Sequence, residues 1–157
     1  MNDKFEVDAS KVLAMLNEFS KNERKQVFRS ATRNALNIVK KQALQNLRSV
    51  IAPNEINKKD KWGNSFRNGI TIKVKRNNKE GVIHIMKNFK MKFFEMGTKQ
   101  RYTKTWRGKP LRKKRFTGTI KASHFFTNSI KTKESEVFAS IDKLLTQSIV
   151  RINNKHK

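Results

Sequence analysis

The sequence predicts an α+β fold in which a long N-terminal amphipathic helix and a C-terminal helix pack on a small antiparallel sheet with a long basic arm. Three observations predict it. Apolar residues recur at helical spacing near both ends of the chain, they alternate with polar residues in the middle, and a stretch without acidic residues separates the alternating part from the last helical part. The length of 157 residues suits one domain, so we expect a single domain over residues 1–157.

Two helices are expected before the first strand. The first is a short helix within residues 1–19, where Asp8 can cap a helical segment that begins at Ala9. The second is a long helix over residues 20–51, because Ser20 and Glu23 have the spacing of a capping box. Such a helix is about 45 Å long, and a sheet or a partner must cover its apolar stripe, which comprises Phe28, Ala31, Ala35, Val39, Ala43, Leu47 and Val50.

The middle of the chain changes from irregular to strand-like. Residues 53–69 follow the end of the long helix at Pro53 and are expected to form an irregular connection. Strands are expected within residues 70–97, because apolar and polar residues alternate from Ile70 to Val74. The antiparallel partner is expected over Val82 to Met86, and a third strand over Phe93 to Met96.

A basic arm over residues 98–122 and a C-terminal helix over residues 123–152 complete the predicted fold. The arm is expected to be a long hairpin that returns near Thr117 to Lys121. The helical period of the last segment allows a break near Thr132.

The chain is strongly basic, and the excess is concentrated in the arm. It contains 37 Lys and Arg against 12 Asp and Glu, a formal charge of +25, and no acidic residue lies between Glu95 and Glu134. A field of this sign attracts polyanions such as nucleic acid, an acidic protein surface or anionic lipid. The candidate residues that face DNA or a protein partner are Lys99, Arg101, Lys104, Arg107, Lys109, Arg112, Lys113, Lys114 and Arg115.

Two interpretations of the arm remain open. It is either a solvated loop rich in Lys and Arg or a phosphate-facing surface whose binding depends strongly on salt. The aromatic residues Tyr102, Trp106 and Phe116 are interleaved with the cations. No base-reading motif is present, so any contact with nucleic acid is expected to be independent of sequence.

The sequence contains no pattern that is typical of a catalytic or metal site. There is no Cys, and the spacing of the three His residues does not create a metal-binding face. The acidic residues are scattered, and no P-loop, GxGxxG or GxSxG motif occurs. We therefore expect no enzyme activity, no catalytic residues, no cofactor and no metal. We also expect no membrane partner, because no apolar run reaches the roughly 18 residues that span a bilayer and the start lacks the pattern of a signal peptide.

Several short motifs follow one another in a fixed order along the chain. A basic amphipathic helix ends near Ala52-Pro53, and a segment with Gly63 and Gly69 then leads into the first strand. An aromatic-Glu-aromatic-Gly-Thr signature follows as Phe94, Glu95, Met96, Gly97 and Thr98, and a Pro-Phe-Leu type motif opens the last helix as Ser123, His124, Phe125 and Phe126. In this order the motifs resemble the tail-completion, or head–tail joining (neck), proteins of tailed bacteriophages. The chain departs from the pattern in its longer connection after Pro53, in Met96 for the second aromatic residue, and in Ser123-His124 where Pro is common.

The resemblance implies a virion structural protein that forms a ring at the phage neck and joins the head and portal to the tail or completes the tail. Its implied partners are itself in a ring, other neck, portal or tail proteins, and genomic DNA in the lumen through non-specific contact. It implies location in the virion, and in the host cytoplasm before assembly. In a closed ring each subunit uses two different patches, and the helix stripe and the arm are the candidates. The alternative is a small non-specific nucleic-acid-binding protein of the cytoplasm, which requires only the charge and the interleaved aromatic residues.

Physical roles can also be expected for three residues of the signature. Gly97 permits a positive φ just after a strand, so the chain can turn sharply into the arm. Thr98 can bond its own backbone neighbours at that turn. A buried Glu95 needs a cationic or N–H partner, expected from the long helix or an adjacent subunit, and would then be structural.

Overall fold

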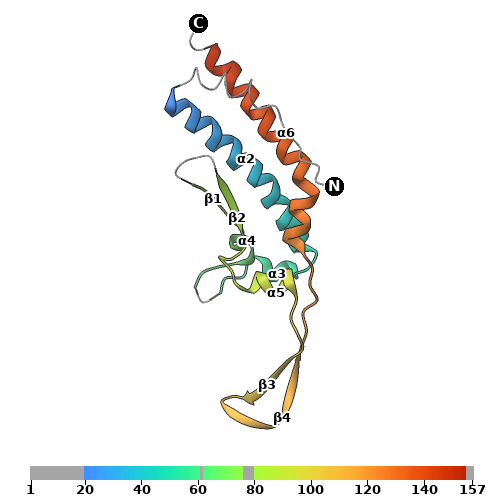
Figure 1. The fold of residues 1–157 in the computed structure, drawn as a ribbon. Coiled ribbons are helices and arrows are strands. Elements are labelled where there is room, and N and C mark those ends of the chain that lie inside the picture. The colour runs from blue at the N-terminus through green and yellow to red at the C-terminus, as the bar shows by residue number, and fades with distance from the viewer. Residues whose placement is uncertain (1–19, 61, 76–79, 155–157) are drawn as a thin grey trace.

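The computed structural model describes residues 20–60, 62–75 and 80–154 (Figure 1). It confirms an α+β fold with long helices near both ends of the chain and small antiparallel sheets between them. The short helix expected within residues 1–19 lies outside the described residues. In chain order the elements are α2 (Lys21–Arg48), α3 (Pro53–Ile56), α4 (Phe66–Gly69), β1 (Thr71–Val74), β2 (Gly81–His84), α5 (Lys90–Met96), β3 (Arg101–Trp106), β4 (Lys109–Gly118) and α6 (Phe125–Asn153).

Helix α2 begins with the predicted capping box. The Ser20 hydroxyl accepts a hydrogen bond from the Glu23 backbone N–H at 3.3 Å, and the Glu23 carboxylate accepts one from the Ser20 backbone N–H at 3.0 Å. These bonds satisfy two N–H groups that would otherwise lack partners at the helix start. The helix ends at Arg48, three residues before the predicted limit. Its buried face consists of Val27, Ala31, Ala35, Val39, Ala43 and Leu47, while the predicted stripe residues Phe28 and Val50 are half-buried and exposed, respectively.

Helix α6 covers the buried face of α2 in antiparallel orientation, and the two helices lie side by side in Figure 1. Near one end of the pair Val27 packs with Ile149 and Ile152, and near the other end Leu47 packs in a cluster with Phe125. Helix α6 is continuous over 29 residues, so the expected break near Thr132 is wrong. Because strands β1 and β2 also lie against α2, the buried part of the stripe, from Ala31 to Leu47, is covered within one chain. The prediction that the stripe is a patch between subunits is therefore wrong for these residues, whereas Val50 is exposed.

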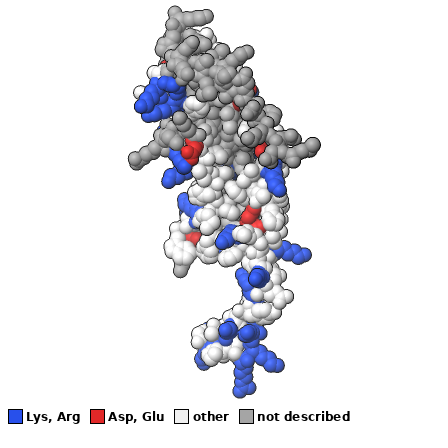
Figure 2. All heavy atoms as spheres, viewed as in Figure 1, with Lys and Arg blue, Asp and Glu red and all other residues white. Residues whose placement is uncertain are grey.

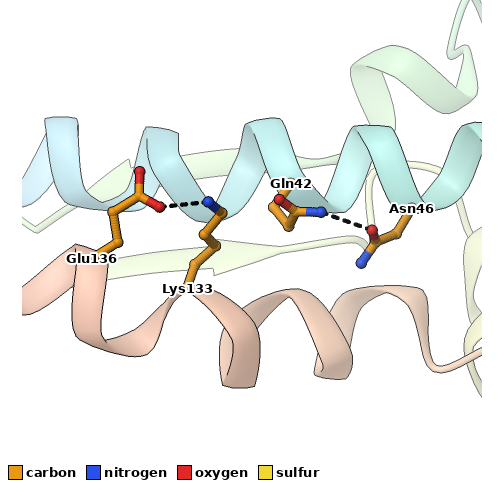
Figure 3. Close-up of polar contacts among 4 residues, drawn as sticks. All are labelled: Gln42, Asn46, Lys133 and Glu136. Carbon is orange, nitrogen blue, oxygen red and sulfur yellow. Dashed lines mark hydrogen bonds and ion pairs between the residues drawn. The ribbon is translucent and has the colours of Figure 1, made fainter.

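A polar contact fixes the position of α6 along α2. The Asn46 side-chain amide donates to the Ser129 hydroxyl at 2.8 Å and to the Phe125 carbonyl at 3.2 Å. Its oxygen accepts from the Gln42 amide at 2.9 Å, and Figure 3 shows this bond. Ser129 is fully buried, and its hydroxyl accepts from the Asn46 amide and donates to the Phe125 carbonyl. A short shift of one helix along the other would break the contacts with both Phe125 and Ser129.

The connection after Pro53 is more regular than predicted. It contains the two short helices α3 and α4, and a Ser65 hydroxyl caps α4 by accepting from the Asn68 N–H at 3.2 Å. The prediction of an irregular segment over all of residues 53–69 is therefore wrong at these helices. Their buried residues Ile56 and Phe66 belong to the same apolar cluster as Leu47, and this tertiary packing stabilises helices too short to persist alone.

The first predicted hairpin is confirmed, but its sheet has two strands. Strands β1 and β2 pair antiparallel from Thr71 opposite His84 to Val74 opposite Gly81. The predicted third strand over residues 93–96 is wrong, because these residues belong to helix α5. Met91 and Glu95, four residues apart, are the buried residues of α5, which is the spacing of one helical face.

Candidate interaction surface: the basic arm and its root

The two signature motifs of the sequence meet in one joint at the root of the arm. The C-terminal end of α5 lies against the N-terminal end of α6, and Ser123 and His124 donate backbone N–H bonds to the carbonyls of Phe94 at 2.9 Å and Glu95 at 3.2 Å. The Ser123 hydroxyl also donates to the Phe94 carbonyl at 2.7 Å. Segments about 30 residues apart are thus connected where the arm leaves the body.

Glu95 caps helix α6 from a different helix. Its buried carboxylate accepts from the Phe126 N–H at 2.8 Å, the Thr127 N–H at 3.1 Å and the Thr127 hydroxyl at 2.6 Å. The residue at the N-cap position, His124, has φ 50° and makes no capping bond with its side chain. A negative charge at a helix N-terminus is favourable because the unpaired N–H groups and the helix dipole are positive there. The expected N–H partners of Glu95 are therefore present, but they belong to α6 and not to α2, the N-terminal helix from which a partner was expected.

The apolar residues of the two motifs are divided between the core and the surface. Phe125 is buried, and Phe126 and Phe94 are half-buried, with Phe94 packed edge to face on Phe66 at a ring-centroid distance of 5.6 Å. Met96, which replaces the aromatic residue of the resembled signature, is 65% exposed. Its exposure places an apolar side chain at the surface beside the arm.

Gly97 makes the turn from α5 into the arm with φ 73° and ψ −178°. The predicted positive φ is confirmed, although it follows a helix and not a strand. This combination of angles is accessible essentially to glycine alone. A Cβ atom here would also lie 2.8 Å from the Ala122 nitrogen and 2.9 Å from the Ile120 oxygen.

Replacement of Gly97 by Ala is expected to destabilise the fold by about 2–4 kcal/mol, because backbone strain and a clash with backbone atoms act together. The matched control is Gly63→Ala, since Gly63 also has a positive φ but has no neighbour within 4 Å of the added Cβ. Urea unfolding of both variants checks the prediction. Equal losses would show that the contact with Ala122 and Ile120 contributes nothing beyond the strain.

Thr98 closes the root of the arm. Its backbone N–H donates to the Ile120 carbonyl at 2.8 Å, and its hydroxyl accepts from the Ile120 N–H at 2.9 Å. The expected bonding of Thr98 to its own neighbours is wrong, because its partner lies 22 residues further along the chain. These two bonds hold together the chain segments that enter and leave the arm.

The arm is the antiparallel hairpin of strands β3 and β4, which projects away from the helices (Figure 1). Its two-residue turn consists of Arg107 with φ 51° and Gly108 with φ 79°, and positive φ at both positions is the type I′ geometry that matches the twist of a hairpin. None of residues 99–121, all of which the structure describes, is buried. The predicted hairpin is confirmed, and it has no apolar core of its own.

The candidate basic residues are all exposed on this hairpin or at its root, and Figure 2 shows Lys and Arg side chains gathered at its end. Two aromatic contacts organise its surface. Tyr102 and Phe116 lie opposite each other with ring centroids 5.5 Å apart, and the Arg115 guanidinium lies 5.2 Å from the centre of the Trp106 ring. The hairpin thus presents positive charge and half-exposed aromatic rings, which suit phosphate contact and stacking.

Other site types are not found in the described part of the chain. Among the described residues, no group of three or more His, Asp or Glu side chains is arranged to hold a metal ion. No helix formed by these residues is long and apolar enough to cross a membrane. Comparisons of the chain with models of protein families, with curated proteins and with solved structures found no match.

Proposed function

We propose that this protein is a virion structural subunit that forms a ring at the neck of a tailed phage, where it joins the head and portal to the tail or completes the tail. The resemblance of its motifs to neck proteins suggests this role. The observation that carries it is the joint at the root, where Glu95 of one motif caps the start of α6 in the other and Gly97 turns the chain into the arm. The joint projects an uncovered arm from a helical body, as expected for a subunit that contacts other molecules.

In this proposal the arm contacts either genomic DNA in the ring lumen or a neighbouring ring. Contact with DNA would be non-specific, because Lys and Arg side chains on an exposed hairpin bind phosphates and read no base. The arm carries cations on both strands and at its turn, including Lys104, Arg107 and Lys113. In this proposal the arm binds its partner through the positive charge of its side chains and through its length, and it catalyses no reaction.

Quantitative mass spectrometry of density-purified particles from the source culture tests the proposal. We expect the protein in purified particles at a small, fixed number of copies per particle, as a single ring requires. The major capsid protein of the same particles gives the reference copy number. Absence from particles, with free protein in the lysate, would contradict a neck role.

The second candidate is a small non-specific nucleic-acid-binding protein. The exposed Trp106 and Tyr102 rings beside Arg and Lys side chains favour it, because such surfaces bind single strands by stacking. Titration of the protein with random-sequence DNA over a range of salt concentrations separates the candidates. A binder of this kind should reach micromolar affinity near physiological salt with a steep salt slope, whereas a neck subunit outside its ring should bind weakly.

A further inference from the structure

The root of the arm carries two grooves with apolar floors and basic rims. One groove, of about 690 Å³, is lined by Lys92, Phe93, Met96, Lys99, Ile120 and Lys121 among others. The second, of about 510 Å³, shares Phe93 and Ile120 with the first and is also lined by Val50, Phe89 and Arg101. Phe89 is 48% exposed and Phe93 is 38% exposed. Large apolar side chains that are clustered and exposed in this way indicate an interaction site.

The chemistry of the grooves selects an occupant with apolar side chains and carboxylates. Their rims carry five Lys or Arg residues and one acidic residue, Glu55. Within this chain of charge +25, residues 1–19 have the opposite character, since they contain four of the 12 acidic residues and only two basic ones. Their apolar residues include Phe5, Val7, Val12, Leu13, Leu16 and Phe19. This segment therefore complements the grooves in both charge and polarity.

The position of the grooves favours a segment from a second copy. Residues 1–19 join the body at Ser20, before the first residue of α2, whereas Val50 at the groove follows its last turn. The 28 residues of α2 separate these points by about 42 Å at the rise of an α-helix. With the helix predicted from Ala9, the segment could span this distance in its own chain only with residues 1–8 fully extended. A neighbouring copy can bring the segment there without such stretching.

We propose that residues 1–19 of one copy dock in the arm-root grooves of a second copy. The apolar side chains of the segment cover Phe89, Phe93 and Met96, and its carboxylates lie against Lys92 and Lys99. Because the two patches differ, the contact is head to tail and can close a ring. The inference rests on the proposed neck function for the ring itself, and it supplies the contact that the buried stripe of α2 cannot make.

Crosslinking between two tagged forms of the full chain tests this docking, since the protein contains no Cys. One form carries Leu13→Cys and a small tag, and the other carries Met96→Cys and a larger tag. A short bis-maleimide reagent should join them into a mixed dimer. The matched control replaces Met96→Cys with Thr146→Cys, an exposed position on α6 more than 20 residues beyond its start at the root, and should give little mixed product.

Charge reversal makes the test specific. Lys92→Glu with Lys99→Glu on the Met96→Cys form should abolish the mixed dimer, and Glu6→Lys with Asp8→Lys on the Leu13→Cys form should restore it. Absence of the mixed dimer, or an equal yield with Thr146→Cys, would overturn the inference. A third form that carries both Leu13→Cys and Met96→Cys would also overturn it if its crosslinks formed only within single copies. If the particles contain ring-like copy numbers but no mixed dimer forms, this contact is refuted and the neck role is not. If the mixed dimer forms but the protein is absent from particles, the neck role is refuted and the contact is not.

Discussion

If the protein is the proposed neck subunit, reversal of Lys113, Lys114 and Arg115 to Glu is expected to leave it folded and to lower the infectious titre of its phage sharply. All three residues are exposed on β4, in a hairpin without buried residues, so the body does not depend on them. If the arm contacts DNA, three lost phosphate contacts should reduce the slope of log affinity against log salt by about 3. If it contacts an acidic protein surface, the same change converts attraction into repulsion.

The measurement combines complementation titres with circular dichroism of the purified variant. The matched control reverses Arg29, Lys131 and Lys143, which are exposed on α2 and α6 and change the net charge by the same amount. Titre should fall for the arm variant alone. A normal titre from the arm variant would remove the arm from the mechanism, and an equal fall for the control would show that total charge is the operative quantity.

Replacement of Glu95 by Ala is expected to destabilise the protein by about 2–4 kcal/mol, because three donors lose a charged acceptor at the start of α6. The donors are the backbone N–H groups of Phe126 and Thr127 and the Thr127 hydroxyl. The carboxylate is buried, so water cannot readily replace it. Glu95→Gln keeps one acceptor oxygen and should lose about half as much.

Urea unfolding provides the measurement, and Glu134→Ala provides the control. Glu134 is an exposed residue of α6, and its removal should change the free energy of unfolding by no more than about 0.5 kcal/mol. A Glu95→Ala variant as stable as the control would contradict the assignment of Glu95 as the cap of α6.

The long helices could be predicted because their signals are long and local. In α2 the capping box of Ser20 and Glu23 marks the start, and a regular stripe of small and branched residues continues from Val27 to Leu47. The period of α6 is equally long. Over such lengths a helical period cannot be confused with the alternation of a strand.

Helix α5 could not be predicted because its conformation depends on distant contacts. Phe93 to Met96 is a short apolar run, which periodicity alone assigns to either a helix or a strand. The decision comes from the burial of Met91 near Gly69 and from the bonds of Glu95 to Phe126 and Thr127. No local pattern reveals partners more than 20 residues away.

Only one part of the candidate surface could be predicted from the sequence, because the other part depends on contacts between distant residues. The cations of the arm are evident from the sequence, because a run without acidic residues is a local property. The grooves are not evident, since residues that are far apart in the sequence line them, including Val50, Phe93 and Ile120. Phe93 was expected in a strand, yet it belongs to helix α5 and is 38% exposed.

The pairing of α2 with α6 also determines when the chain can complete its fold during synthesis. Roughly 105 residues separate the end of α2 from the end of α6, which a ribosome adds in about 5–20 s at 5–20 residues per second. Until then the apolar face of α2 lacks the helix that covers it. The arm root is also incomplete, because Glu95 and Gly97 lie against residues near the start of α6. An unfinished chain therefore has neither a closed body nor a fixed arm, and translation itself delays assembly until α6 has been made.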